Sequence, residues 1–288
     1  MATLVFADTE LARRLEGLTA REMWRFARAA NETLPESGAL AIDVAGGVAA
    51  FVGKGSPVNQ AFGLGFADEV TDDDIALLER FFAWRGAVAK VGVCPLADPS
   101  LIRALGARGW VPGDFENVLL REVDPTEQFP DSDIEIRECA PDERDLWARA
   151  VAVGFASPAL PTQPELELGR IVAAREDTVL LLAWVDGEPA GTGELLIDDG
   201  VGWLSADTTL LPFRGRGIQR ALQIERLRRA AAAGCTLAVT ESRPGSASQR
   251  NMERLGFRVA YTRMDMTAPP TVLSAHAMPQ DDEKERPS

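Results

Sequence analysis

The chain has 288 residues, of which 46% are hydrophobic and 26% are charged, a balance typical of a globular protein with one or two domains. Its formal net charge of -14 excludes broad binding to nucleic acids or anionic membranes, since both require positive protein surfaces. The single histidine, His276, excludes Ser-His-Asp and Cys-His nucleophilic sites and argues against a histidine-ligated zinc, so we expect no metal.

Cysteine usage and hydropathy indicate where the protein works. Three well-separated cysteines (94, 139 and 235) have neither disulfide nor metal-site spacing, which favours a reducing compartment. No apolar run reaches transmembrane length, and the first twenty residues are charged rather than signal-like. We therefore expect a cytoplasmic protein with no membrane partner.

The first 124 residues have the pattern of one α/β unit. Leucines at helical spacing predict a long helix over 8–33, which Pro35 and Gly38 end. Further elements follow in order: strands 39–44 and 48–52 as a hairpin, strand 59–66, a helix from Thr71 to about Arg85, strand 87–93, helix 101–107 and an extended pair from Trp110.

Residues 125–133, with Pro125, Pro130 and scattered acids, are predicted to be a linker to a second unit over 134–266. That unit's expected elements are strand 134–138, a helix from Pro141, helix 165–174, strands 179–185 and 190–197, a strand reaching Thr209, a long helix to Gly234, strand 235–240, helix 246–255 and strand 257–264. Residues 267–288, with four prolines and mixed charge, are predicted to be a disordered tail.

The two units repeat one order of elements. Residues 86–100 parallel residues 234–248, and Leu105-Gly106 parallels Leu255-Gly256, at separations of 148 and 150 residues. Two ordinary βα units could produce this by coincidence, but the near-equal spacing favours a tandem duplication.

The most informative stretch runs from Asp207 to Leu222. Gly215 and Gly217 lack Cβ atoms, so the backbone N–H groups of this turn can approach an anion closely. A helix begins here, and its first N–H groups and its dipole favour negative charge. Six arginines (214, 216, 220, 226, 228 and 229) lie close together in this acidic chain. The pattern predicts a phosphate seat for a small polyanionic ligand; an arginine-rich solvated helix is the alternative.

Arg214-x-x-Gly217-x-Gln219 resembles the Arg/Gln-x-x-Gly-x-Gly/Ala signature of the GNAT superfamily of acetyl-CoA-dependent N-acetyltransferases. The resemblance implies tandem α/β domains, each with a mixed, mainly antiparallel sheet flanked by helices. It also implies acetyl-CoA as cosubstrate. The residues that would hold it are Asp207, Thr208 and Thr209 along the pantetheine, Arg214, Gly215, Arg216, Gly217, Ile218, Gln219 and Arg220 at the pyrophosphate, and Ser248 and Asn251 nearby.

The chain departs from the family's pattern at three places. Gln219 replaces the signature's last small residue, Gly245 stands where an asparagine is frequent, and Met252 stands where the tyrosine general acid is frequent. Ser248 and Asn251 are the polar substitutes available. Arg226, Arg228 and Arg229 could reach a 3′-phosphate, but the pattern favours solvated helix residues.

The first unit lacks the phosphate-binding chemistry. Its equivalent loop, residues 67–74, carries five carboxylates, which suit a helix start but repel a pyrophosphate. Gly63-Leu-Gly65 lacks the third glycine of a dinucleotide fingerprint. We interpret this half as a degenerate copy with a structural or substrate-shaping role.

Three residues are candidates for proton transfer. Glu194 lies on a predicted central strand where burying a carboxylate is costly, and Glu241 ends the strand after the long helix. Tyr261 is the chain's only tyrosine and could protonate the leaving thiolate. For each, a structural role is the competing interpretation.

The sequence therefore predicts an N-acetyltransferase that moves an acetyl group from acetyl-CoA to an amine, most simply that of a small molecule rather than a protein. A non-catalytic acyl-CoA sensor or interaction module is the alternative, and an ATP or dinucleotide binder is a third class. The expected partners are acetyl-CoA and the amine, with no nucleic acid; a monomer and a homodimer both remain open.

Overall fold

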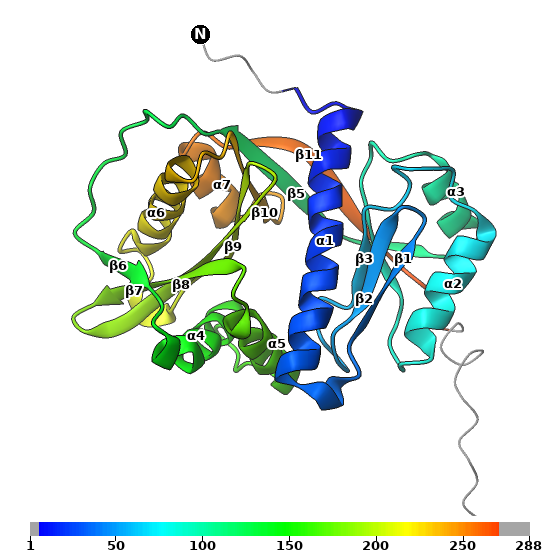
Figure 1. Cartoon of the computed structure of the whole chain (residues 1–288), viewed down its shortest axis with the longest axis horizontal. Helices are drawn as coiled ribbons and strands as arrows, with labels where there is room; N and C mark the ends of the chain where they lie inside the picture. The colour runs from blue at the N-terminus through cyan, green and yellow to red at the C-terminus, as the bar shows by residue number, and fades with distance from the viewer. Residues whose placement is uncertain (1–5, 271–288) are drawn as a thin grey trace, which may run out of the picture.

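The computed structural model describes residues 6–270 and contains a continuous eleven-stranded sheet with the order β1-β2-β3-β4-β11-β5-β10-β9-β8-β7-β6 (Figure 1). The elements of the N-terminal half are α1 (Thr9–Thr33), β1 (Leu40–Val44), β2 (Gly47–Phe51), β3 (Gln60–Phe62), α2 (Asp72–Ala83), β4 (Lys90–Val93), α3 (Ser100–Ala107) and β5 (Val111–Glu122). Those of the C-terminal half are β6 (Glu135–Glu138), α4 (Arg144–Ala156), α5 (Gln163–Ala174), β7 (Thr178–Val185), β8 (Glu188–Asp198), β9 (Val201–Thr209), α6 (Ile218–Ala232), β10 (Leu237–Ser242), α7 (Ala247–Arg254) and β11 (Arg258–Thr267).

The two halves repeat one arrangement of strands and helices. In each half a run of antiparallel strands, β1 to β3 or β6 to β9, is followed by a helix, a strand parallel to the last strand of the run, a short helix and a final strand. The two parallel pairs of the sheet, β3–β4 and β9–β10, occupy equivalent places, and the other neighbouring strands are antiparallel. The predicted tandem α/β fold with mainly antiparallel sheets is confirmed.

The final strands of the two halves are exchanged. β11 of the C-terminal half pairs with β4, and β5 of the N-terminal half pairs with β10. The two exchanged strands also pair with each other along most of their length. The division at residues 125–133 remains a proposal, and these strands link the parts on either side of it into one sheet.

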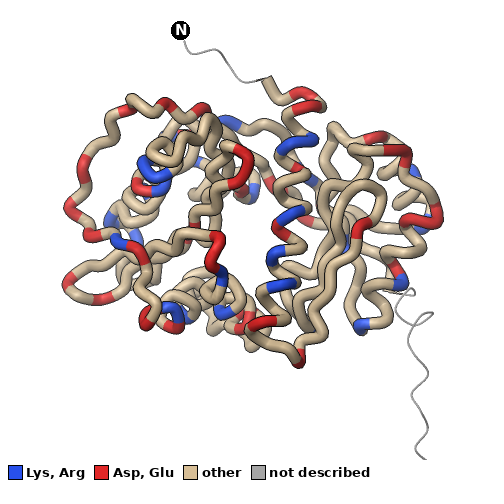
Figure 2. The backbone as a smooth tube through the Cα atoms, viewed as in Figure 1, with Lys and Arg blue, Asp and Glu red and all other residues tan. Residues whose placement is uncertain are grey.

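Helix α1 lies where the two halves meet (Figure 1). Its residues Ala12, Leu15 and Leu18 share a buried cluster with side chains from strands of both halves, including Val118, Trp203, Val239 and Tyr261. Basic residues recur along the helix (Figure 2). Three of its arginines form ion pairs with the turn between β8 and β9: Arg14 with Asp199, and Arg21 and Arg25 with Asp198.

A buried ion network fastens α1 to the exchanged strand β11. Glu16 Oε1 accepts hydrogen bonds from Nη2 of Arg263 at 2.8 Å and from the hydroxyl of Tyr261 at 2.7 Å. Nη1 of Arg263 also donates to Glu241 on β10 at 2.6 Å. Because Glu16 and Arg263 are both almost fully buried, each neutralises a charge that would be costly on its own.

Several predicted boundaries are wrong, for local reasons. The strand expected over 59–66 is only Gln60–Phe62, because Gly63 and Gly65 have φ of 76° and turn the chain. Helix α5 begins at Gln163, where Thr162 and Glu165 form a capping box. β10 starts at Leu237 rather than at residue 235, and β11 extends to Thr267. The tail predicted beyond that point lies outside the described residues from 271 onward.

In residues 6–270, no helix is both long and apolar enough to cross a membrane.

Replacing Arg263 with methionine should lower the free energy of unfolding by about 3–5 kcal/mol, because Glu16 and Glu241 would lose their buried partner. The control is Arg14→Met, which removes a pair at the surface and should cost less than about 1 kcal/mol. Urea denaturation measures both values, and equal losses in the two variants would contradict the role given to the buried network.

Candidate functional site

The site is built around a gap between two parallel strands. β9 and β10 pair only at Val201–Leu237, Gly202–Ala238 and Trp203–Val239. The Thr240 hydroxyl then donates to the carbonyl of Leu204 at 2.9 Å, and beyond this point the two strands separate. The far half of β9 stays paired with β8 on one edge, and no strand within residues 6–270 pairs with its other edge. An extended amide-bearing ligand can pair with such an edge.

A bulge deforms β9 beside the gap. Between the pairs Thr192–Thr208 and Glu194–Ser205, two residues of β9 oppose one residue of β8. Ala206, within the bulge, has φ of 51°, in the left-handed region that disfavours a residue with a Cβ by about 1–2 kcal/mol. Strain of this kind persists only where the surroundings impose it.

Arg226 of α6 supplies that constraint. Its guanidinium donates to the carbonyls of Glu194 at 3.2 Å and Ser205 at 2.9 Å, and it pairs with the carboxylate of Asp207. Burial raises the pKa of Asp207, and the attraction of Arg226 opposes the shift.

The expectation of a solvated Arg226 is wrong, since the side chain is fully buried. Arg228 and Arg229 are partly exposed and pair with acids, among them Asp131 and Glu138.

Two of the three β9 residues predicted to bind the ligand direct their side chains to different helices. Asp207 faces α6, whereas Thr208 shares a 2.7 Å hydrogen bond with Thr192 and packs against Gly154 of α4. Thr209 accepts a hydrogen bond from Nε of Arg214 at 3.3 Å through its carbonyl. Any contact that Asp207 and Thr208 make along the gap is therefore one of backbone groups.

The turn after β9 has the geometry of an anion seat. Gly215 and Gly217 both have φ of 81°, with open space where a Cβ would stand. Gly217 is the N-cap of α6, and no side chain of the residues that the structure describes accepts from the helix's first N–H groups. Arg214, Arg216 and Arg220 are exposed around it, and Ile218 anchors the helix start in the core.

The remaining predicted cofactor residues meet between α6 and α7. The amide of Gln219 donates to the Ser248 hydroxyl at 3.3 Å and accepts from the Asn251 amide at 2.7 Å. Gln219, which departs from the family signature, thus makes a polar bridge across the mouth of the gap. The structure brings together all three residues, and their ligand contacts remain predictions.

Two buried polar residues of this region were missed by the sequence reasoning. Gln223 lies one turn beyond Gln219 and is fully buried beside the carboxylate of Asp207, and neither polar atom of its side chain makes a hydrogen bond of normal geometry in the described part of the chain. The hydroxyl of Ser242, at the end of β10, is also buried without a partner. Unsatisfied buried polar atoms are rare in native proteins and suit a ligand that carries amides. The i, i+4 spacing of the two glutamines was the available signal.

The proton-transfer candidates lie in different surroundings. Glu194 is buried, accepts from the Ser205 hydroxyl at 2.9 Å, and lies 3.6 Å from Nη1 of Arg175. Glu241 is partly exposed and is held by Arg263. Tyr261 is buried against Glu16, and burial together with that carboxylate raises the pKa of the phenol.

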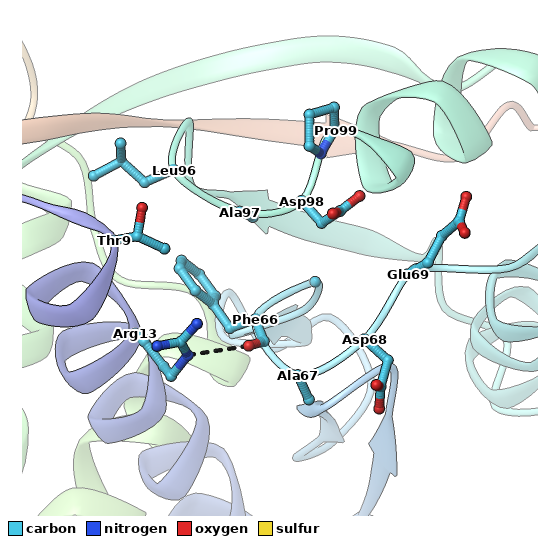
Figure 3. Close-up of a pocket in the computed structure, with 11 residues that line it drawn as sticks. Thr9, Arg13, Phe66, Ala67, Asp68, Glu69, Leu96, Ala97, Asp98 and Pro99 are labelled. Carbon is cyan, nitrogen blue, oxygen red and sulfur yellow. Dashed lines mark hydrogen bonds between the residues drawn. The ribbon is translucent and has the colours of Figure 1, made fainter.

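The equivalent gap in the N-terminal half is closed. The N–H of Asp98 donates to the carbonyl of Gly65 at 2.8 Å and joins the loops that follow β3 and β4. The start of α2 is blocked by a capping box of Thr71 and Asp74. A surface cavity of about 420 Å³ remains, lined by both loops and the start of α1; Figure 3 shows Arg13 directed at the carbonyl of Phe66 beside it. This hydrogen bond closes the space between the two loops, whereas β9 and β10 separate beyond Trp203 and Val239.

In the described residues, no group of three or more histidine, cysteine, aspartate or glutamate side chains could hold a metal ion.

Together these features define a class of protein. It has a tandem α/β fold, and only one of the two copies has an open gap between its parallel strands and a helix start without a side-chain cap. The profile of the Acetyltransferase (GNAT) family matches residues 142–257, so the second half of the chain contains a domain of this family. No curated protein matches the chain.

Solved structures share the fold along nearly the whole chain. A GCN5-related N-acetyltransferase from Kribbella flavida is 20% identical, with a TM-score of 0.60 over 88% of this chain and 98% of that one. A tandem GNAT protein from the clavulanic acid biosynthesis pathway is 15% identical, with a TM-score of 0.57 over 92% and 98% of the two chains. At these identities the likeness establishes the tandem fold alone.

Replacing Gln223 with leucine should leave the ligand-free protein at least as stable, because it removes a buried amide that has no partner. The same change should raise the Kd for CoA about tenfold, the equivalent of one lost hydrogen bond. Thermal denaturation and calorimetric titration with CoA measure the two effects. Gln128→Leu, at an exposed position, is the control, and an unchanged Kd in Gln223→Leu would contradict a ligand role for this amide.

Proposed function

We propose that the C-terminal half is an acetyl-CoA-dependent N-acetyltransferase that acylates an amine by direct attack on the thioester. The observation that carries the proposal is the uncapped start of α6 at the end of the β9–β10 gap. The N–H groups around Gly215 and Gly217 would hold the diphosphate, and the free edge of β9 would pair with the pantetheine amides. The unpartnered atoms of Gln223 and Ser242 fit that amide-bearing arm.

The N-terminal half does not repeat this function in our proposal. Its helix start is capped by side chains and surrounded by acids, and its strand gap is closed by a backbone hydrogen bond. It contributes α1 and β5 to the sheet face that the acceptor would approach. This half is a degenerate copy that completes the fold and shapes the acceptor side.

The charges on that face favour a cationic acceptor. Glu194 and Glu241 stand on opposite sides of the gap, and Glu116 of β5 lies beside Arg263 and near Glu241. Burial and the nearby Glu241 raise the pKa of Glu116 to about 7, against the attraction of Arg263. A small protonated amine suits this surface better than an anion. The free cysteines in the described residues fit a cytoplasmic setting.

A non-catalytic acyl-CoA sensor is the second candidate, favoured by one observation. Tyr261 is buried against Glu16 instead of standing free at the gap, and the family's usual tyrosine position holds Met252. A sensor needs the anion seat and has no need of an acid or a base.

Incubating the protein with acetyl-CoA and a panel of small amines should release CoA thiol in an amine-dependent way. Mono-, di- and polyamines belong in the panel, with N-terminal peptides as the protein-like arm. A thiol-reactive dye measures the release. Tight CoA binding with no release for any amine would establish the sensor, and stabilisation by ATP or NAD but not by CoA would overturn both candidates.

Gly217→Asp should weaken CoA binding at least about tenfold, because a carboxylate enters the anion seat, with little change in the fold. Gly86→Asp is a matched control: Gly86 also has a positive φ and open space around it, but it lies in the N-terminal half. Calorimetric titration with CoA measures both variants. Equal Kd values for the two would count against the seat.

A further inference from the structure

Ser205 stands between the gap and the buried carboxylate of Glu194. It is the second residue of β9 beyond the last pair with β10, and it is only partly buried, whereas Glu194 behind it is buried. The two residues are direct partners across β8 and β9, so their side chains share one face of the sheet. The Ser205 hydroxyl donates to Glu194 Oε2 at 2.9 Å, which leaves its oxygen free to accept another proton.

The other oxygen of Glu194 makes no hydrogen bond of normal geometry among the described residues, and the Thr178 hydroxyl nearby favours the charged carboxylate. Oε1 is buried and lies 3.6 Å from Nη1 of Arg175, beyond hydrogen-bond distance. A buried carboxylate with one unsatisfied oxygen is costly to keep charged, and it gains stability by taking up a proton.

Arg175 forms an ion pair with Glu194 at 3.6 Å but donates its hydrogen bonds to other carboxylates. Its guanidinium donates to Glu22 of α1 at 2.8 Å and to Asp177 at 3.0 Å, so its charge is shared among three carboxylates. Glu22 in turn accepts from Arg25 at 2.7 Å. The other charged groups near Glu194 donate hydrogen bonds to backbone carbonyls. Arg226 donates to the carbonyl of Glu194, and Arg144 donates to the carbonyl of Arg175.

We propose that Ser205 relays a proton from the acceptor amine to Glu194, and that Glu22 of the N-terminal half adjusts the charge balance of this relay through Arg175. This inference rests on the proposed N-acetyltransferase function and gives α1 a positioning role in it. Burial raises the pKa of Glu194, Arg175 opposes the shift and Glu22 adds to it, in keeping with a group that takes up a proton.

The reaction balances with these groups. The ammonium acceptor passes one proton through the Ser205 hydroxyl to Glu194, which later releases it to water. The freed nitrogen lone pair attacks the thioester carbon, forming the C–N bond, while the C–S bond breaks with its electrons on sulfur. A second proton from the nitrogen goes to sulfur, so the products are the acetamide and CoA thiol.

The relay is tested with Ser205→Ala and Ser205→Thr, assayed with whichever amine of the panel the wild type acetylates. Ser205→Ala should lower kcat about 100-fold, a usual contribution of proton transfer, with the Kd for CoA unchanged. Ser205→Thr retains a hydroxyl and should recover most of the rate. A Ser205→Ala variant with wild-type kcat would overturn the relay.

Glu22→Gln tests the positioning role through the pH profile. Removing Glu22 takes away a negative charge that favours the protonated carboxyl and frees Arg175 to favour the carboxylate, so the pKa of Glu194 falls. Because the base must be deprotonated to act, the rising limb of kcat/KM should move to lower pH. Glu22→Asp should restore the wild-type profile, and Glu32→Gln, at an exposed position on the same helix, should leave it unchanged.

Carbon-13 NMR of glutamate-labelled protein gives a readout that needs no acceptor. The Glu194 carboxyl signal, identified by its loss in Glu194→Gln, should titrate with a lower midpoint in Glu22→Gln than in the wild type. An unmoved midpoint or pH limb would overturn the role of Glu22. If the wild type acetylates no amine, the proposed function fails, and the NMR titration still decides whether Glu22 acts on Glu194.

Discussion

The separation of β9 from β10 after three residue pairs is the constraint on which the site depends. A fully paired parallel ladder would fill this edge of β9 with backbone hydrogen bonds and leave no path for an extended ligand. The gap stays open because β10 continues to pair with β5 on its other side, while Arg226 holds the bulge in β9. The buried arginine therefore serves the geometry of the site although it cannot touch a ligand in solvent.

The exchanged strands explain why the half with the closed gap belongs to the same structural unit. β5 borders β10, and α1 covers the junction between the halves, so the surroundings of the gap contain groups from both. Glu16 and Glu22 of α1 each pair with an arginine of the C-terminal half, Arg263 and Arg175. The N-terminal copy has a closed gap, but the carboxylates of its helix α1 share arginine partners with the carboxylates of the other copy.

Local features were predictable from the sequence, and features that depend on distant contacts were not. The turn at Gly215 and Gly217 was predicted because positive φ values require glycine there. The exchange of β5 and β11 was not predicted, since the alternation of apolar and polar residues in a strand does not identify the neighbouring strand. Arg226 was misjudged because it sits among exposed arginines, and only the bulge gives it buried partners. Ser205 carries no motif, Gln223 offered only its i, i+4 spacing from Gln219, and the relevance of both comes from where the gap places them.

A crystal structure of the full chain with CoA bound tests the central claim most directly. The account predicts the diphosphate against the backbone N–H groups from Arg216 to Gln219, with the pantetheine along β9 and its sulfur near Ser205. A diphosphate bound at α2, or on a surface away from the start of α6, would contradict it.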